Sequence, residues 1–300
     1  MRRSVVLLIT LALIVAMASL LYVGLEMAER ASQGLERRHF LIQSHTLLQN
    51  VLEILDRKQG EINSSEGLEM LIDLPIELES EEIDLSISFD SAAKGVNPNN
   101  FLKKGKKRTI IDSDFVLLFD RILQTYNVQN KELFIALIED TLDKDLDERI
   151  PGSELALTNR RFAQGAIENR AKFDMLIEAY IRLTEDPNIL SVPWEEILSF
   201  YAPQIDLNYI SPTLLRLILP YLDEGSVKRL TVGRKRLYKG LKDLPLAKED
   251  REELKKYRVS PFVPVVVAKI GIRRGEWEGE IDLVYDIAEK RVLNIEEKIF

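Results

Sequence analysis

Cysteine is absent from this 300-residue sequence, and histidine occurs only twice, as His39 and His45. The chain therefore has no disulfide and no thiolate chemistry, which is compatible with an oxidising compartment without proving one. The two histidines lie six residues apart in a helical pattern, so they do not share a helix face. The G-x-S-x-G, Walker A and G-x-G-x-x-G motifs are also missing. These absences predict that the protein is not an enzyme.

Charged residues are absent from Ser4 to Leu25, directly after Arg2 and Arg3. About 20 apolar residues, at ~1.5 Å per residue in a helix, span the ~30 Å hydrocarbon core of a membrane. Arginines before such a segment favour a cytoplasmic N-terminus and export of the remaining chain. The sequence thus predicts a single membrane-spanning segment with the bulk of the chain on the far side.

A cleaved secretory signal is the alternative, because Ala16-Met17-Ala18 matches the A-x-A pattern of a cleavage site. Cleavable signals usually turn polar after the cut, whereas Leu20-Leu21-Tyr22-Val23 continues the apolar run. A retained anchor is therefore the preferred interpretation.

The helical pattern continues beyond this segment, because Glu26 to Arg57 contains no proline and only one glycine, Gly34. Apolar residues recur there at helical spacing, on a side that broadens toward the C-terminal end. The pattern predicts one helix from about Val5 to Arg57, half of it in lipid and half packed on a folded domain. A membrane anchor followed by a separate coiled-coil stalk is the alternative that the sequence leaves open.

The overall composition is that of a folded protein, with 46% hydrophobic and 30% charged residues. The net charge of −8 disfavours a protein whose main task is to coat nucleic acid, although it permits a local basic patch. No nucleic-acid partner is expected.

Patterns typical of β-strands occupy both ends of the remaining chain. Ile83–Phe89 alternates apolar and polar residues, and the apolar run Leu68–Leu74 is also expected to be extended. Asp90–Arg108 is expected to be a loop with a basic cluster. Three strands are predicted near the C-terminus, with turns at Arg274-Gly275 and Ala288-Glu289: Phe262–Arg273, Glu278–Ile287 and Arg291–Lys298.

Helical periodicity fills the chain between these strands. Helices are expected at Phe115–Tyr126, Lys131–Leu142, Asn169–Leu183, Trp194–Tyr201, Ser211–Leu222 and Asp250–Tyr257. Sheets of two or three strands are marginal alone, so the strands from both ends are expected to form one antiparallel sheet packed on the N-terminal helix. The predicted fold class is α+β, with a large all-α domain inserted between the strands.

The expected division of the chain has five parts. They are residues 1–25 for the leader and transmembrane segment, 26–58 for the continuation of the N-terminal helix, 59–108 for the first part of the sheet domain, 109–258 for the inserted helical domain and 259–300 for the C-terminal strands.

Acidic residues concentrate between positions 139 and 154. Carboxylates at alternate positions of a looped backbone can converge on Ca²⁺, because calcium prefers six to eight oxygen ligands. The spacing does not match an EF-hand loop. A solvated acidic loop, neutralised by Lys144 and Arg149, is the alternative. The candidate calcium ligands are Asp143, Asp145, Asp147 and Glu154.

Basic residues crowd a second segment, which has no acidic residue between Ser226 and Lys242. A helix-hairpin-helix contact to DNA would need a glycine-rich hairpin that presents backbone N–H groups to phosphate. No such hairpin lies between the predicted helices, so a protein–protein contact or a solvated face is preferred. The basic residues are Lys228, Arg229, Arg234, Lys235, Arg236, Lys239 and Lys242.

Three stretches, in order along the chain, carry a resemblance to a known family. Arg3–Ile9 looks like a prepilin-peptidase region, Leu137–Asp145 with Ile150–Glu154 looks like the family's "DW.D.D … G.E" stretch, and Ile205–Leu215 looks like its "IN.N.AP…L" segment. Together with the order of helix, sheet and helical insertion, they resemble general secretion pathway protein K, the K-component minor pseudopilin of type II secretion systems.

The resemblance implies a non-enzymatic inner-membrane subunit, with its body in the periplasm, that caps or initiates a short pseudopilus. Its implied partners are other minor pseudopilins and the prepilin peptidase, which would cut between Ser4 and Val5. The family normally has glycine where this chain has Ser4. The fifth mature residue would be Ile9, and the K component typically lacks the glutamate that most pilin-like proteins carry there. Calcium binding by some K-type pseudopilins supports the candidate site in the acidic segment.

Two other functions share this topology and stay open. One is a minor subunit of a type IV pilus, and the other is a membrane-anchored nucleic-acid-binding component of DNA uptake, of the helix-hairpin-helix type.

Overall fold

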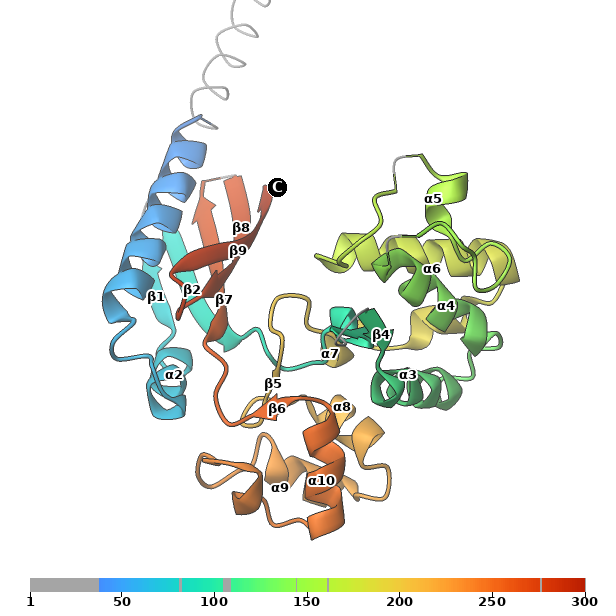
Figure 1. Ribbon diagram of the computed structural model, residues 1–300. Helices are drawn as coiled ribbons and strands as arrows, with labels where there is room; N and C mark the ends of the chain where they lie inside the picture. Colours follow the sequence, from blue (N-terminus) through green and yellow to red (C-terminus); the bar gives the residue numbers. More distant parts are fainter. Residues whose placement is uncertain are drawn as a thin grey trace, which may run out of the picture.

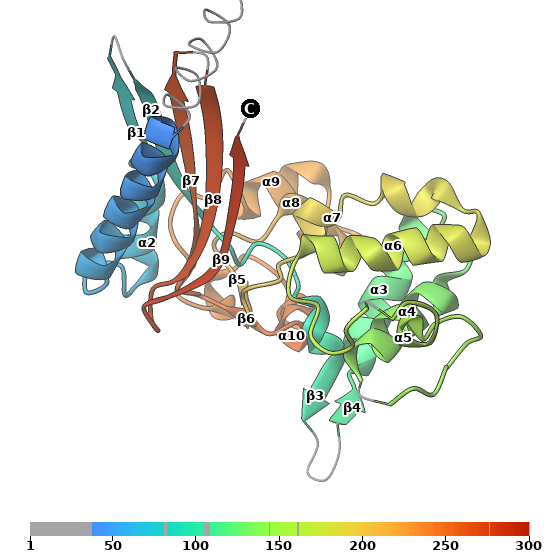
Figure 2. The same ribbon diagram turned by 90° about the horizontal axis from the view of Figure 1, so that it is seen from above.

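The computed structural model describes residues 38–80, 83–104, 109–143, 145–160, 162–275 and 277–299. These residues form two parts, a five-stranded sheet with an N-terminal helix and a larger body of helices (Figures 1 and 2). The chain therefore has a mixed α+β fold built on an antiparallel sheet, as the sequence predicts.

The predicted transmembrane segment, Ser4–Leu25, and the predicted processing site at Ser4 and Val5 lie outside the described residues. Within the described ranges, no helix is both long enough and apolar enough to cross a membrane.

The sheet has the strand order β1-β2-β7-β8-β9, and every neighbouring pair is antiparallel. Strand β2 pairs directly with β7, which places Ser91 opposite Val266. Strands from both ends of the chain thus build one sheet, as predicted. The strands are β1 Ile76–Glu79, β2 Asp84–Ser91, β7 Val265–Arg274, β8 Trp277–Asp286 and β9 Arg291–Ile299.

The N-terminal helix, described from residue 38 to residue 58, lies across one face of this sheet (Figure 1). Its buried side chains recur at helical spacing and share one core with alternate residues of β7 and β8. A Cβ at Gly279 would lie 2.9 Å from the Phe40 ring, so glycine lets the helix sit close to β8. The buried helix residues are Phe40, Ser44, Leu48, Val51 and Leu55, and the facing strand residues include Ala268, Ile270, Ile281 and Leu283.

Helix α2, Ser65–Ile72, corrects the expectation of an extended segment at Leu68–Leu74. Its N-terminus is capped by Ser64, whose Oγ accepts a hydrogen bond from the Gly67 N–H at 3.2 Å. Leu68, Leu71 and Ile72 are spaced three and four residues apart, which is a helical pattern that brings them to the sheet core. The prediction was wrong because it was based on the apolar character of the run, whereas the spacing of its apolar residues is helical.

The chain leaves the sheet after β2 and returns at β7, and the residues between form the helical body. Two small strand pairs also occur there, so the inserted part is not all-α as predicted, and β3 falls in the segment Asp90–Arg108 that was expected to be a loop. The pairs are β3 Leu102–Lys104 with β4 Thr109–Ile111, and β5 Ile205–Asp206 with β6 Val259–Ser260. Its helices are α3 Ser113–Thr125, α4 Lys131–Leu142, α5 Leu155–Thr158, α6 Arg170–Thr184, α7 Trp194–Ile197, α8 Pro212–Ile218, α9 Glu224–Leu230 and α10 Lys248–Lys256. Its 3₁₀ turns are η1 Pro98–Phe101, η2 Pro187–Ser191 and η3 Leu241–Asp243.

The predicted helix bounds are close for α3, α4, α6 and α10 and too long for α7 and α8. Helix α7 ends at Ile197 because the next residues form a bridge to the segment before η1, where Ser199 N–H donates to the Val96 carbonyl at 2.9 Å. Helix α8 ends just before Pro220, which disfavours helical backbone at the preceding residue.

Trp194 is at the centre of the helical core, with only 2% of its surface exposed. Its ring lies 6.1 Å from Phe119, 5.6 Å from Phe134 and 5.0 Å from Phe173, measured between centroids. Its Nε1–H donates to the Ile189 carbonyl at 3.1 Å, so the one polar group of the buried indole is satisfied. The tryptophan therefore serves as a packing anchor.

The two parts meet where residues 92–98 and 259–264 leave and re-enter the sheet, and Asp206 holds these segments together. Its backbone N–H donates to the Ala93 carbonyl at 2.8 Å. Its carboxylate accepts from the Asn208 N–H and from the Val263 N–H, both at 2.9 Å. Burial raises the pKa of Asp206 to about 7, although both N–H donors act in the opposite direction. A single buried carboxyl group thus connects the helical body to both connecting segments.

Candidate functional site

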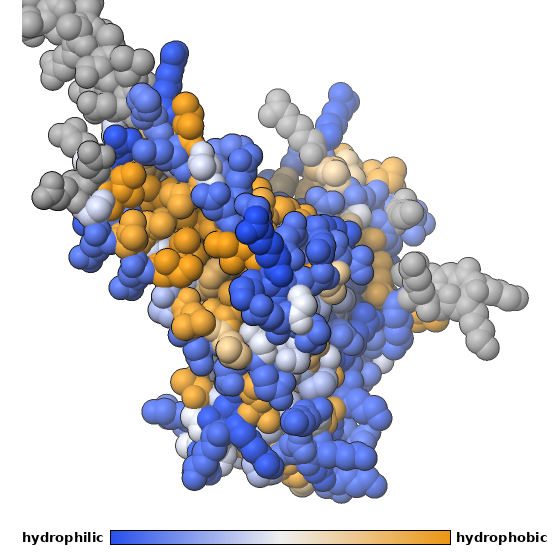
Figure 3. Space-filling view, turned by 90° about the vertical axis from the view of Figure 1, so that its left-hand side faces the viewer, coloured by the Kyte–Doolittle hydropathy of each residue, from blue (hydrophilic) through white to orange (hydrophobic). Residues whose placement is uncertain are grey.

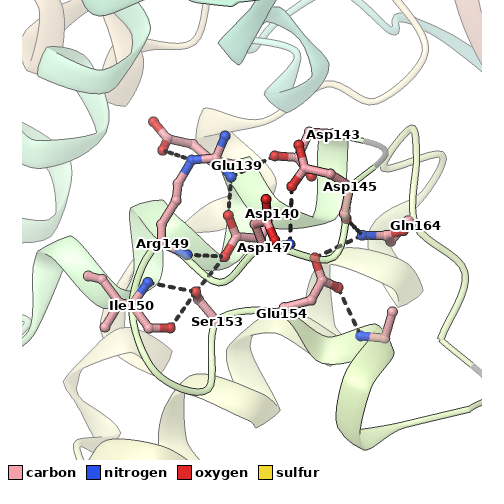
Figure 4. A network of polar contacts seen from close by, with 11 residues as sticks. Glu139, Asp140, Asp143, Asp145, Asp147, Arg149, Ile150, Ser153, Glu154 and Gln164 are labelled. Atoms are coloured by element: carbon pink, nitrogen blue, oxygen red, sulfur yellow. Dashed lines mark hydrogen bonds and ion pairs between the residues drawn. The ribbon is translucent and has the colours of Figure 1, made fainter.

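The loop after α4 carries the predicted calcium ligands, and Arg149 lies among them (Figure 4). Its guanidinium forms ion pairs with Glu139 at 3.1 Å, with Asp143 at 2.6 Å and with Asp140. Asp140 is completely buried and also accepts hydrogen bonds from the Arg149 backbone N–H at 3.1 Å and from the Ser153 hydroxyl. The loop is therefore organised around a buried aspartate and its arginine partner.

The acidic residues and Arg149 shift one another's pKa values. Burial raises the pKa of Glu139 and of Asp143, and Arg149 works against both shifts. Burial also acts to lower the pKa of Arg149, but its hydrogen bonds to Asp140 and Asp143 outweigh this effect and raise that pKa above its usual value. Arg149 thus stays charged and supplies positive charge inside the acidic loop.

Three of the four predicted ligands interact electrostatically, but among the described residues they do not form a group arranged to hold a metal ion. Burial is the largest cause that raises the pKa of Asp143 and of Glu154; the charge of Asp145 adds to the first shift, and the charges of Asp140 and Asp143 add to the second. Glu154 is completely buried and accepts from the Ala156 N–H at 3.0 Å and from Gln164 Nε2 at 2.8 Å.

Asp147 is exposed, as Asp145 is, and its backbone N–H donates to Asp145 Oδ1 at 3.2 Å. This contact is made by the Asp147 backbone and not by its carboxylate.

The donor set partly suits calcium. Asp143 Oδ1 is buried and has no hydrogen-bond partner among the described residues, and Asp145 is exposed. Carboxylate oxygens of this kind are the ligands that calcium prefers. Against this, Arg149 already pairs with Asp143, and no three Asp, Glu or His side chains of the described chain are arranged to hold a metal ion. Calcium binding stays a prediction: Asp143 pairs with Arg149 through Oδ2, which leaves Oδ1 to face an ion.

The basic segment around α9 presents most of its charge to solvent. Six of its seven basic residues are exposed. The exception, Arg234, pairs with Glu69 of α2 at 3.1 Å, and its guanidinium lies 5.1 Å above the Tyr209 ring. Helices α8 and α9 are joined by residues 219–223, which contain no glycine. The exposed residues are Lys228, Arg229, Lys235, Arg236, Lys239 and Lys242.

Sequence reasoning missed a hollow of about 490 Å³ between α2 and the helical body. Glu69 and Asp73 line it from the sheet side, and Tyr209 and Arg234 line it from the other. The Tyr209 hydroxyl and Arg234 Nε are buried without a hydrogen-bond partner in the part of the chain that the structure describes. No local pattern predicts this hollow, because its walls come from segments far apart in the sequence.

Comparison of the sequence with family models and with curated proteins finds no match. A solved structure, the GspK-GspI-GspJ complex of the type 2 secretion system from enterotoxigenic Escherichia coli, contains a chain with a similar fold. The TM-score is 0.63 at 12% identity, and the likeness covers 90% of this chain and 99% of that chain. The fold that the resemblance to general secretion pathway protein K predicts is thus confirmed: this chain has the fold of a subunit of that complex.

Proposed function

We propose that this chain is a minor pseudopilin of a type II secretion system, where it caps or initiates the periplasmic pseudopilus. The observation that carries the proposal is the likeness along nearly the whole chain to a subunit of the GspK-GspI-GspJ complex. The helical body inserted between β2 and β7 is part of this likeness, and the three resembling sequence stretches support the same role. By analogy with that complex, the partners are other minor pseudopilins.

Deletion of the gene and measurement of the secreted proteins tests the role. Loss of secretion that the wild-type gene restores supports the proposal. Unchanged secretion with lost transformation contradicts it in favour of DNA uptake, and unchanged secretion with lost pili contradicts it in favour of a type IV pilus. Co-purification of the chain with other pseudopilins from the same cells tests the partnership directly.

The proposed location follows from the N-terminal sequence. Ser4–Leu25 anchors the chain in the inner membrane, with the N-terminus in the cytoplasm and the body in the periplasm. The prepilin peptidase cuts between Ser4 and Val5. Mass spectrometry of the native N-terminus tests this cut: a chain that begins at Val5 supports it, and a chain that still carries Arg2 and Arg3 contradicts it. The Ser4→Gly variant, with the family's usual residue, is the matched control.

The acidic loop is proposed to bind Ca²⁺ through Asp143, Asp145 and Glu154, with Asp147 as the peripheral fourth carboxylate. Isothermal titration of the purified chain with calcium chloride tests this site. Heat that disappears in the Asp145→Asn variant and persists in the Glu132→Gln variant, which alters an exposed acid at the start of α4, supports it. No heat up to millimolar calcium contradicts it.

A further inference from the structure

Strand β1 forms one edge of the sheet, and no described strand pairs with its outer side (Figure 2). All four of its residues, Ile76–Glu79, are exposed. The outer side of an edge strand presents unpaired backbone N–H and C=O groups, which an added strand can satisfy. The edge is thus a surface on which an extended segment can be recognised.

One face of β1 is apolar. Ile76 lies opposite Ile87 of β2, and Ile87 belongs to the core beneath the N-terminal helix, so Ile76 and Leu78 are on the helix side of the sheet. The N-terminal helix does not bury these two side chains: 42% of the surface of Ile76 and 55% of that of Leu78 are exposed. Leu74 and Met70 add exposed apolar surface close by in the chain, at 64% and 67%. Figure 3 shows apolar side chains gathered over this side of the molecule.

The other face of β1 is acidic. Glu77 and Glu79 alternate with the apolar residues and lie opposite Ser86 and Asp84 of β2. Both glutamates border a shallow hollow of about 300 Å³. The nearby cation, Arg273, already pairs with Asp84 at 3.0 Å. Among the described residues, neither glutamate makes an ion pair, although the charge of Glu79 also acts on Arg273. Both carboxylates are therefore available to pair with a cation of a partner.

We propose that the β1 edge binds an extended segment of another protein in which apolar residues alternate with lysine or arginine. Added as a further strand, such a segment places its apolar side chains against Ile76 and Leu78. Its basic side chains then lie beside Glu77 and Glu79, because directly opposite residues of paired strands share a face.

The same charges disfavour a second copy of this chain as the occupant. An antiparallel pair of β1 strands centred on Leu78 would place Glu77 of each copy opposite Glu79 of the other, and like charges directly opposite one another are destabilising. A shift by one residue would put the glutamates on the apolar face. A basic, alternating strand avoids both conflicts.

A peptide-binding experiment on the purified full chain tests the proposal. The probe is a fluorescent peptide that alternates valine and lysine, and its controls are a peptide that alternates valine and glutamate and a scrambled peptide of the same composition. Fluorescence anisotropy should show at least tenfold tighter binding of the alternating basic peptide than of either control.

Charge reversal locates the contact. In the double variant Glu77→Lys and Glu79→Lys, the preference should switch to the valine–glutamate peptide, which also demonstrates that the variant is folded. The same reversal at Glu296 and Glu297, on the opposite edge strand β9, should leave the preference unchanged. Hydrogen exchange should show protection of the β1 amides when the basic peptide binds.

Three results overturn the proposal: equal binding of the scrambled and alternating basic peptides, loss of binding in the β9 variant but not in the β1 variant, or protection confined to β9. Self-association of the free chain that the β1 charge reversal changes would assign the edge to a second copy instead.

Discussion

Replacing Asp206 by asparagine tests how the two parts of the molecule are joined. The buried carboxylate accepts one backbone N–H from Asn208 and one from Val263. An asparagine can accept only one of these through its carbonyl oxygen, and its NH₂ group would face the second donor. At pH 5 the carboxyl group of Asp206 is protonated, and its hydroxyl oxygen can still accept the second N–H through a lone pair, which an amide NH₂ group cannot do. A buried N–H left unpaired costs about 1–3 kcal/mol, so the variant should be less stable than the wild type by this amount at pH 5.

The raised pKa of Asp206 predicts that the stability of the wild type falls as the pH rises. Burial raises the pKa of Asp206 in the folded chain to about 7, above its ordinary value of 3.8. The native state thus favours the protonated form, and this contribution to stability is present below pH 4 and is lost as the pH rises through 7. Between pH 5 and pH 8, the free energy of unfolding of the wild type should fall by about 2–3 kcal/mol through this group alone.

Urea unfolding of the wild type and the variant at pH 5 and at pH 8, followed by circular dichroism, measures the effect. The stability advantage of the wild type should shrink or reverse at pH 8, because asparagine does not titrate. Glu249→Gln, which alters an exposed acid of α10, should show no such pH-dependent change. An equal difference between wild type and Asp206→Asn at both pH values would refute a protonated Asp206.

Three further substitutions probe other contacts. Arg149→Met leaves the buried Asp140 without its cation and should lower the unfolding free energy by about 3–5 kcal/mol in urea titrations; a loss below about 1 kcal/mol would show that the buried aspartate does not depend on Arg149. Gly95→Ala places a Cβ 2.4 Å from a backbone oxygen of α7 and should destabilise by about 1–3 kcal/mol, whereas a neutral effect would show that the segments are not in close contact. Phe40→Ala should cost about 3–5 kcal/mol in thermal unfolding, and Ile42→Ala, with 64% of its surface exposed, should change stability by less than about 0.5 kcal/mol.

The sheet and the longer helices were predictable because their signals are local. Alternation along β2, β7 and β8 and the caps of the helices identify each element from its own residues. The predicted turn at Arg274-Gly275 is confirmed, with Gly275 in the left-handed region at φ +57°. The marginal stability of small sheets then required the strands from both ends to pair.

The contacts that arise from the meeting of distant segments were not predictable in this way. The sequence gives no local sign that Asp206 differs from the other acidic residues. Only the fold shows that its carboxylate accepts a hydrogen bond from the Val263 N–H. The role of Arg149 was partly foreseen as a neutralising charge, but its pairing with the fully buried Asp140 depends on how the loop folds back on α4. The short strand β1 has too few residues to give a pattern of its own.

The pairing of β2 with β7 also sets the order in which the molecule can fold. Ser91 meets Val266 only after every residue of the helical body has been made, whereas the contacts of α3 with α4 and of α4 with α6 join segments that are close in the sequence. Local contacts form faster than distant ones, and chains emerge from the N-terminus, so these first helices are free to fold while β2 still lacks β7. Until β7 and β8 are made, the apolar sides of β2 and of the N-terminal helix lack the strands that bury them. Exposed apolar surface promotes aggregation, so a chaperone is expected to bind the chain during this interval.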